Sequence, residues 1–390
     1  MSFFLLLIVA VVVIALITPV VSEKPLWRAT VTPLASIIGS GFLILGPILI
    51  HDFGVWAPLV MLVLCALAWG FGAAIRANIQ RIGEQPAPDS QAERIGGWML
   101  SVAYMISVAY YLNLLGSFAV SLTPWNTDIA GKIVTTIVYG VLLILGVWRG
   151  FSALEAVEYP AVVIKLAVIA ALISALTLFT WDTHVSAELL VPEGQLHGWG
   201  AVTLIFGLLI TVQGFEISRY MGSSYSARQR VGSMKLAQGI ATVIYVVYVA
   251  LLTVSVDVPG GGVSETEIIA LMEQVSPLLP LLLVVAALAA QFSAGVADTG
   301  GAGGLLSEVS QRMFSERQGY VAVAVVGLVL TWAVDVFTII AIASRAFALY
   351  YAMQCYIAAH HSGGRTRVMF GVMGLMGLAA ALLGTPVEGA

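Results

Sequence analysis

The stretch "ASIIGSGFLILGP" at residues 35–47 decides how this chain folds. It is as apolar as a membrane-spanning helix, yet Gly39, Gly41 and Pro47 lie within it. Glycine and proline both weaken the interior of a helix. A break at bilayer depth needs a ligand, water or neighbouring protein to satisfy the freed backbone groups. The stretch therefore predicts either a functional interruption or a site of tight helix packing by small residues.

The whole chain has the composition of a membrane protein. Of its 390 residues, 60% are hydrophobic and 10% are charged, whereas a soluble domain carries about 25% charged residues. Apolar runs recur that are long enough to cross a bilayer, and they predict an all-α polytopic membrane protein with about 12 transmembrane helices. The runs lie near residues 1–21, 29–50, 56–75, 97–122, 131–148, 154–180, 199–221, 235–256, 277–302, 320–334, 336–358 and 367–385.

The lysines and arginines collect on one side of these predicted helices. If the segment before the second helix is cytoplasmic, the outer side receives Lys132 alone, while Lys165 and Arg345 fall within helices. The cytoplasmic side receives Lys24, Arg28, Arg76, Arg81, Arg94, Arg149, Arg219, Arg228, Arg230, Lys235, Arg312, Arg317, Arg365 and Arg367. Because cytoplasmic loops are rich in Lys and Arg, we expect both termini outside. The expected location is a bacterial inner (plasma) membrane.

The second to sixth predicted helices form one set of five, and the seventh to eleventh form another. Residues 29–181 start in the cytoplasm, and residues 199–358 start outside. An odd-numbered unit repeated in tandem crosses the membrane in the opposite direction, which makes a five-plus-five inverted repeat. We therefore expect four parts: an extra N-terminal helix at 1–22, the two repeats, and a C-terminal helix at 365–390.

An inverted repeat predicts a second broken helix at the start of the second repeat. That helix contains "LLITVQGFEISRYMG" at residues 208–222, with Gln213, Gly214 and Glu216 near its middle. Two interruptions at matching positions favour a binding site over simple packing. Glu216 could bind a cationic group of a solute or brace Arg219 on the same helix.

The first break would present backbone amides at bilayer depth. The amides of Ser40, Gly41 and Phe42 would lie at the start of the second half-helix, which is the positive end of its dipole. An anionic group such as a carboxylate binds well at such a helix start.

Charged residues also lie deep within other predicted helices. Lys165 is near mid-membrane, where a lysine costs about 2.5–3.5 kcal/mol on insertion scales, unless it snorkels to the interface. Asp298, next to Thr299, needs a cation or a wet cavity. We expect Asp298 to pair with Lys165, with Arg345 as the rival partner. Tyr104, Tyr110 and Tyr111 suit packing, although Tyr110 could line a central cavity.

The sequence shows no catalytic chemistry. It contains no nucleophile–base–acid arrangement, no metal-ligand spacing and no phosphate-binding loop. Cys65 and Cys355 lie inside apolar runs, where a free cysteine packs as a small hydrophobe. We expect no enzyme activity, no cofactor, no metal and no nucleic-acid partner.

Three stretches resemble the amino acid–polyamine–organocation (APC) transporter superfamily, over about residues 29–358. "IIGSGFLILGP" looks like that family's first-helix signature, a G-[SA]-G break followed by a proline. "VQGFEISRYMGSSYSARQRV" looks like its sixth-helix signature, a Y-x-G-F-E break with a polar, basic segment after it. "RGFSALEAVEYPAVVIKLAVI" resembles the fifth helix, which carries a lysine in many members.

The resemblance implies a fold of the leucine-transporter type in which Ser40, Gly41 and the backbone around Gly214 cradle the substrate. The predicted substrate residues are Gly39, Ser40, Gly41, Phe42, Tyr110, Gln213, Gly214, Phe215 and Glu216. The resemblance also implies that the Lys165 ammonium replaces the sodium ion of sodium-driven members, near Asp298 and Thr299. Coupling would then be to protons.

The sequence thus favours a secondary active transporter of an amino acid or a related small organic solute. It would couple to protons through Lys165 and work by alternating access. One alternative is an inorganic-cation (K⁺ or divalent) transporter of the same fold, with Asp298 and Glu216 as hard oxygen ligands. Another is a non-transporting membrane sensor or assembly subunit. The expected partners are the solute, the coupling proton and the lipid bilayer, with a homodimer as a further option.

Overall fold

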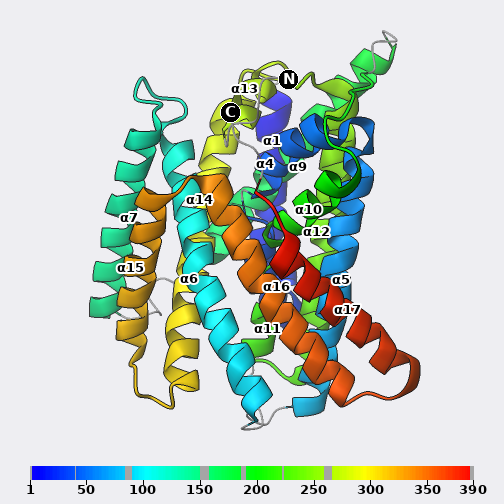
Figure 1. Ribbon diagram of the computed structural model, residues 1–390. Helices are drawn as coiled ribbons and strands as arrows, with labels where there is room; N and C mark the ends of the chain where they lie inside the picture. The colour runs from blue at the N-terminus through cyan, green and yellow to red at the C-terminus, as the bar shows by residue number, and fades with distance from the viewer. Residues whose placement is uncertain are drawn as a thin grey trace.

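A computed structural model describes an all-helical bundle (Figure 1). The described residues are 2–39, 41–83, 90–149, 158–185, 190–221, 224–258 and 266–386. Apart from two short 3₁₀ helices, η1 and η2, the regular elements in these ranges are α-helices.

The helices follow one another with short connections. In chain order they are α1 (Ser2–Ile17), α2 (Pro19–Ser22), α3 (Pro25–Ile37), α4 (Gly41–Phe53), η1 (Gly54–Trp56), α5 (Ala57–Ile82), α6 (Gln91–Val120), α7 (Asp128–Arg149), α9 (Glu158–Val185), α10 (Gly198–Gly207), η2 (Leu209–Val212), α11 (Ile217–Tyr220), α12 (Ala227–Ser255), α13 (Glu267–Glu273), α14 (Leu279–Val309), α15 (Glu316–Ala333), α16 (Val336–His360) and α17 (Gly364–Leu383).

Within the described residues, 7 helices are long and apolar enough to cross a membrane. One of these, Gly41–Ile82, contains parts of two predicted spans, because η1 joins α4 to α5 without a non-helical gap. Other predicted spans are built from shorter helices, such as the 16 residues of α1 and the 10 residues of α10. The chain is therefore an all-helical polytopic membrane protein, and the number twelve stays a prediction.

Both expected helix breaks are present. The first lies between Ile37, the last residue of α3, and Gly41, the first residue of α4. In the second, α10 ends at Gly207, η2 follows, and the chain leaves helical conformation before α11. Gly214 in this second break has a φ of +112°, a conformation that glycine adopts without a steric penalty.

Long helices from the two halves of the chain build the core. α6 packs along α14 and α16 near the centre of the bundle (Figure 1). The apolar stretch of α6 is 89% buried inside the protein, whereas that of α17 is 17% buried. α6 is thus an internal helix, and α17 turns most of its apolar surface outward, as a helix in contact with lipid does.

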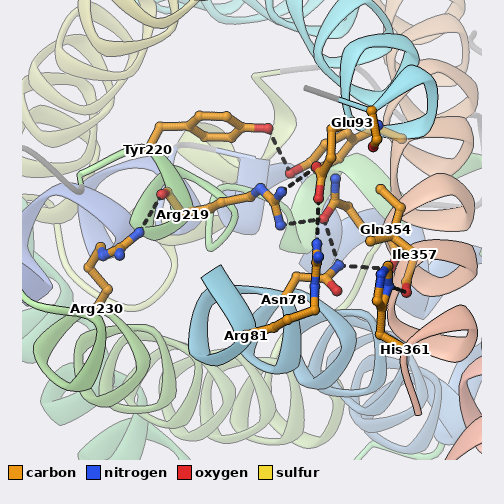
Figure 2. Close-up of polar contacts among 11 residues, drawn as sticks. Asn78, Arg81, Glu93, Arg219, Tyr220, Arg230, Gln354, Ile357 and His361 are labelled. Carbon is orange, nitrogen blue, oxygen red and sulfur yellow. Dashed lines mark hydrogen bonds and ion pairs between the residues drawn. The ribbon is translucent and has the colours of Figure 1, made fainter. Parts of the chain in front are cut away.

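The two ends of the bundle differ in charge. α11 and the start of α12 lie at the lower end in Figure 1, and α13 lies at the upper end. Arg81, Arg219 and Arg230 meet at the lower end, which we call the arginine-rich end (Figure 2). The Lys and Arg bias predicts that this end faces the cytoplasm.

Candidate substrate and coupling site

The two breaks lie against each other. A Cβ on Gly214 would be 2.5 Å from the Ser36 Oγ atom and 2.7 Å from the backbone nitrogen of Ile37. The Tyr245 hydroxyl donates a hydrogen bond to the Ile37 carbonyl at 2.6 Å, and it lies 3.4 Å from the Thr211 carbonyl. The structure therefore brings the two interrupted segments into direct contact.

Lys165 on α9 binds the end of α3. Its Nζ atom donates hydrogen bonds to the carbonyl oxygens of Ala35 at 2.6 Å and Ile38 at 2.7 Å. Carbonyls at a helix C-terminus lack partners in their own helix and carry the negative end of its dipole. Lys165 is 1% exposed, so its ammonium stays at the break and does not snorkel to the interface.

The expected ion pair between Lys165 and Asp298 is wrong. The Asp298 Oδ2 atom accepts a hydrogen bond from the Ser107 hydroxyl on α6, and its Oδ1 atom has no hydrogen-bond partner among the described residues. Arg345, the rival partner, donates from Nε and Nη2 to the carbonyl of Gly384 beyond α17. Packing of α6 against α14 decided this outcome, because it places a serine beside the carboxylate.

Thr299 contributes its hydroxyl to its own helix. Its Oγ1 atom donates to the Gly295 carbonyl at 2.6 Å, a common arrangement for threonine inside a helix. Thr299 is buried beside Asp298 on α14, and its expected part in ion coupling stays a prediction.

Around the first break, aromatic side chains fill the space that glycines leave. A Cβ on Gly41 would collide with the Tyr110 hydroxyl, and one on Gly39 would lie 3.2 Å from the Tyr111 ring. The Phe42 ring stacks on Tyr245 with a centroid distance of 5.8 Å. The Phe42 side chain is therefore a packing residue, and the expected ligand contact of Phe42 is through its backbone amide. Ser40 lies outside the described residues.

Around the second break, polar side chains hold the backbone. Gln213 donates from Nε2 to the Tyr111 hydroxyl at 2.7 Å. Glu216 accepts from the Gly214 amide and from the Tyr351 hydroxyl, both at 2.9 Å and both at Oε2. The Phe215 ring stacks on Tyr351 at 5.2 Å.

Several buried polar atoms near the breaks have no hydrogen-bond partner in the part of the chain that the structure describes. They include Gln213 Oε1, Glu216 Oε1 and Asp298 Oδ1. Buried polar atoms in native proteins are nearly always paired. A ligand with donor groups would satisfy these acceptor atoms.

A cavity lies beside α11, with walls that also come from α3, α6 and α14. It has a volume of about 580 Å³, and we call it the vestibule. Its wall includes Thr32 of α3, Tyr104 of α6, Tyr220 and Met221 at α11, and Ala297 and Gly301 of α14. The helices next to the two breaks, α3 and α11, thus both contribute to the wall of the vestibule.

The alternative role for Glu216, bracing Arg219, is also wrong. Arg219 pairs with Glu93 at 2.5 Å and donates to the Gln354 side chain at 2.8 Å (Figure 2). Glu93 also pairs with Arg81 at 2.7 Å. This group connects α11 to α5, α6 and α16 at the arginine-rich end. Glu216 is not part of it and bonds Gly214 and Tyr351 instead.

Some polar side chains that serve the site were expected only to pack or were not singled out. Tyr104, Ser107 and Tyr111 lie on one face of α6, at the i, i+3 and i+7 spacing of an α-helix. That spacing of polar side chains in an apolar helix was the available signal. Tyr351 could not be found in this way, because its role depends on Glu216 of a distant segment.

Comparisons with known proteins agree with this architecture. A family model for APC superfamily transporters matches residues 19–384. An uncharacterized protein of Aquifex aeolicus (strain VF5) is 41% identical over 355 residues, which cover 88% of this chain and 86% of that protein.

Two solved structures share the fold at low sequence identity. One is Mhp1, a nucleobase-cation-symport-1 family transporter in a closed conformation with bromovinylhydantoin bound. Its TM-score is 0.56 at 16% identity, covering 91% of this chain and 90% of Mhp1. The other is MhsT in complex with L-phenylalanine, with a TM-score of 0.58 at 13% identity, covering 90% of this chain and 98% of MhsT.

A membrane bundle with two facing helix breaks is the architecture of a secondary transporter with the leucine-transporter fold. The chain belongs to the APC superfamily of transporters.

Proposed function

We propose that this protein transports an amino acid or a related small organic solute and couples that transport to protons through Lys165. The observation that carries the proposal is the pair of hydrogen bonds from the Lys165 ammonium to the end of α3. A cation at this point stabilises the negative end of a half-helix. Loss of the proton would remove that charge and weaken the attachment of α3 to α9.

The groups at the two breaks complement an amino acid. The amides of Gly41 and Phe42 begin α4, where the helix dipole favours a carboxylate. Glu216 Oε1 and Gln213 Oε1 lack partners among the described residues and could accept from the ammonium of the same molecule. The L-phenylalanine bound to MhsT adds fold-level support for a ligand of this size.

A thermal-shift screen of the purified protein tests the substrate class. A ligand that binds the folded state raises its stability by RT ln(1 + [L]/Kd), about 2.7 kcal/mol at 100 times Kd. We expect stabilisation by one or more amino acids and none by K⁺ or Mg²⁺ beyond an ionic-strength control. Stabilisation by an inorganic cation alone would instead support the cation-transporter alternative.

Uptake into proteoliposomes then tests the coupling. With the solute found in the screen, an inward proton gradient should drive accumulation in the absence of sodium. A strict requirement for sodium would contradict the assignment of Lys165.

A further inference from the structure

Asp298 is a buried carboxylate that does not contact Lys165 in the hydrogen bonds described above. It lies within α14 and is 0% exposed. Ser107 donates to its Oδ2 atom, whereas its Oδ1 atom has no hydrogen-bond partner in the described ranges. An ionised carboxylate in this position would lack much of the solvation that water provides. A proton or another cation on Oδ1 would remove that penalty.

Basic side chains of the described chain do not provide that cation. No salt bridge to Asp298 is present among the residues that the structure describes. Lys165 of α9 donates to α3, and Arg345 of α16 donates to Gly384. Arg219 of α11 is paired with Glu93. The described residues thus supply no positive charge to Asp298.

The remaining polar groups around Asp298 are neutral or acidic. On α6, the Ser107 hydroxyl donates to Asp298, and Tyr104 and Tyr111 lie about one turn before and after Ser107 on the same face. From the second break, the charged group is the acidic Glu216, whose Oε2 atom accepts from the Gly214 amide and the Tyr351 hydroxyl.

Other described elements packed on α14 add no competing cation near Asp298. On α15, Tyr320 packs its ring against Gly303, more than one helical turn from Asp298, and Glu316 lies at the vestibule. On α13 the charged side chains are the acidic Glu267 and Glu273, and on α3 Arg28 donates to the Ser22 carbonyl.

The vestibule brings water close to Asp298. Its volume of about 580 Å³ is many times the roughly 30 Å³ that one water occupies in the liquid. Ala297 and Gly301, on either side of Asp298 in the chain, belong to its wall. Glu308 and Glu316 are charged side chains on that wall.

Tyr104 connects the vestibule to the carboxylate. It lines the vestibule, and its ring lies 3.1 Å from the place where a Cβ on Gly301 would be. Its hydroxyl is buried without a hydrogen-bond partner among the described residues, and its backbone carbonyl lies 3.0 Å from the same Ser107 hydroxyl that binds Asp298. A tyrosine hydroxyl can accept one proton and donate another, so Tyr104 has the chemistry to relay a proton from the vestibule toward Asp298.

We propose that Asp298 is a proton-binding site, distinct from Lys165, that is loaded from the vestibule through the Tyr104 hydroxyl. In this step an O–H bond forms at Asp298 Oδ1, a hydronium ion in the vestibule becomes water, and no other bond changes in the balance. Glu216 is the weaker candidate for the same proton, because its carboxylate already accepts two hydrogen bonds at Oε2.

Infrared spectroscopy of the purified protein tests the proposal without any solute. At a pH of about 6, well above the ~4 at which exposed carboxylates titrate, the wild-type protein should show the C=O stretching band of a protonated carboxyl group. The band should disappear in Asp298→Asn. It should remain in Lys165→Met and in Asp128→Asn, whose side chain is 73% exposed. A wild-type spectrum without the band would overturn the proposal, as would a band that is lost in Glu216→Gln but kept in Asp298→Asn.

Two further variants test the contacts and cover a failure of Asp298→Asn to fold. Ser107→Ala removes the donor to Oδ2, so the frequency of the band should shift; an unshifted band would contradict the assignment to Asp298. Tyr104→Phe removes the relay hydroxyl, and exchange of the carboxyl proton for deuterium should slow by about a hundredfold, as expected for loss of a positioned proton-transfer group. An unchanged exchange rate would reject the route through Tyr104.

The inference rests on the proposed function only for its part in transport. If the band behaves as expected while uptake proves independent of protons, Asp298 binds a proton and the proposed coupling fails. If uptake depends on protons and on Lys165 but the band is absent, the proposed function stands and the Asp298 site is rejected.

Discussion

Lys165 and Gly214 are single residues on which the geometry of the site depends. Lys165 supplies the donors that the C-terminal carbonyls of α3 lack. Gly214 lets the second break approach the first, because any side chain there would meet Ser36 and Ile37. Lys165 thus provides a charge and Gly214 provides space. One substitution at each residue tests these two roles separately.

Replacing Lys165 with methionine should abolish proton-driven uptake of the solute found in the binding screen. Methionine keeps most of the side-chain length and removes the charge that faces the end of α3. The matched control is Lys132→Met, because Lys132 forms only a partly exposed pair with Asp128 at 2.9 Å. Uptake that is lost equally in both variants, or kept in Lys165→Met, would contradict this role.

Gly214→Ala should lower the midpoint of thermal unfolding and abolish solute binding. A non-glycine residue at its φ of +112° costs on the order of 1–3 kcal/mol. The new methyl group would also press on the Ile37 backbone at 2.7 Å. Gly140→Ala is the control, since a Cβ there meets none of the described atoms within 4 Å and alanine favours a helix by about 1 kcal/mol. Equal midpoints for the two variants would show that the contact between the breaks is loose.

At the scale of the element, the short helix α11 is held by one acidic side chain. Glu93 at the start of α6 pairs with Arg219 of α11 and with Arg81 of α5 (Figure 2). Gln354 of α16 receives a further bond from Arg219, and Arg230 donates to the Arg219 carbonyl at 2.8 Å. A helix of 4 residues is not stable by itself, so these contacts set its position beside the vestibule.

Glu93→Gln should therefore destabilise the protein by about 3–5 kcal/mol, the usual cost of leaving a buried charge without its partner. Arg219 would be that charge, since its side chain is 5% exposed. Asp128→Asn removes an acidic partner that is 73% exposed, and it should cost less than about 1 kcal/mol. Thermal unfolding midpoints compare the two variants. Similar midpoints would mean that water solvates the Arg219 group.

At the scale of the whole molecule, the two ends of the bundle differ in their charged groups and in their cavities. The arginine pairs lie at one end of the bundle, and the vestibule opens there. The first half of the second broken helix, α10, instead binds the segment after α17, because Thr385 donates from its backbone to the Thr203 carbonyl at 3.0 Å. The vestibule thus lies beside α11, at the end that we expect to face the cytoplasm.

Labelling with a membrane-impermeant maleimide tests this orientation in intact cells. A cysteine at the exposed Asn126, between α6 and α7, should react from outside, whereas one at the exposed Gly363, before α17, should react only after permeabilisation. Cys65 and Cys355 are buried, so background labelling should be low. The reverse pattern would place the vestibule on the outer side.

The sequence by itself determined the membrane class, the all-helical fold and the positions of both breaks. These features depend on local properties: the length of apolar runs, the weak helix propensity of glycine and the polar residues at 213–216. The resemblance to the APC superfamily rested on the same local stretches, because each signature is a short run of neighbouring residues.

Only the tertiary structure decided which side chains meet. Lys165 binds Ala35 and Ile38, and Asp298 binds Ser107, although two opposite charges in one apolar chain favoured a direct pair. The reason is geometric: α9 packs against the end of α3, while α6 packs along α14. Which helix faces which depends on interlocking side-chain surfaces between distant segments, and no local pattern in the sequence contains that information.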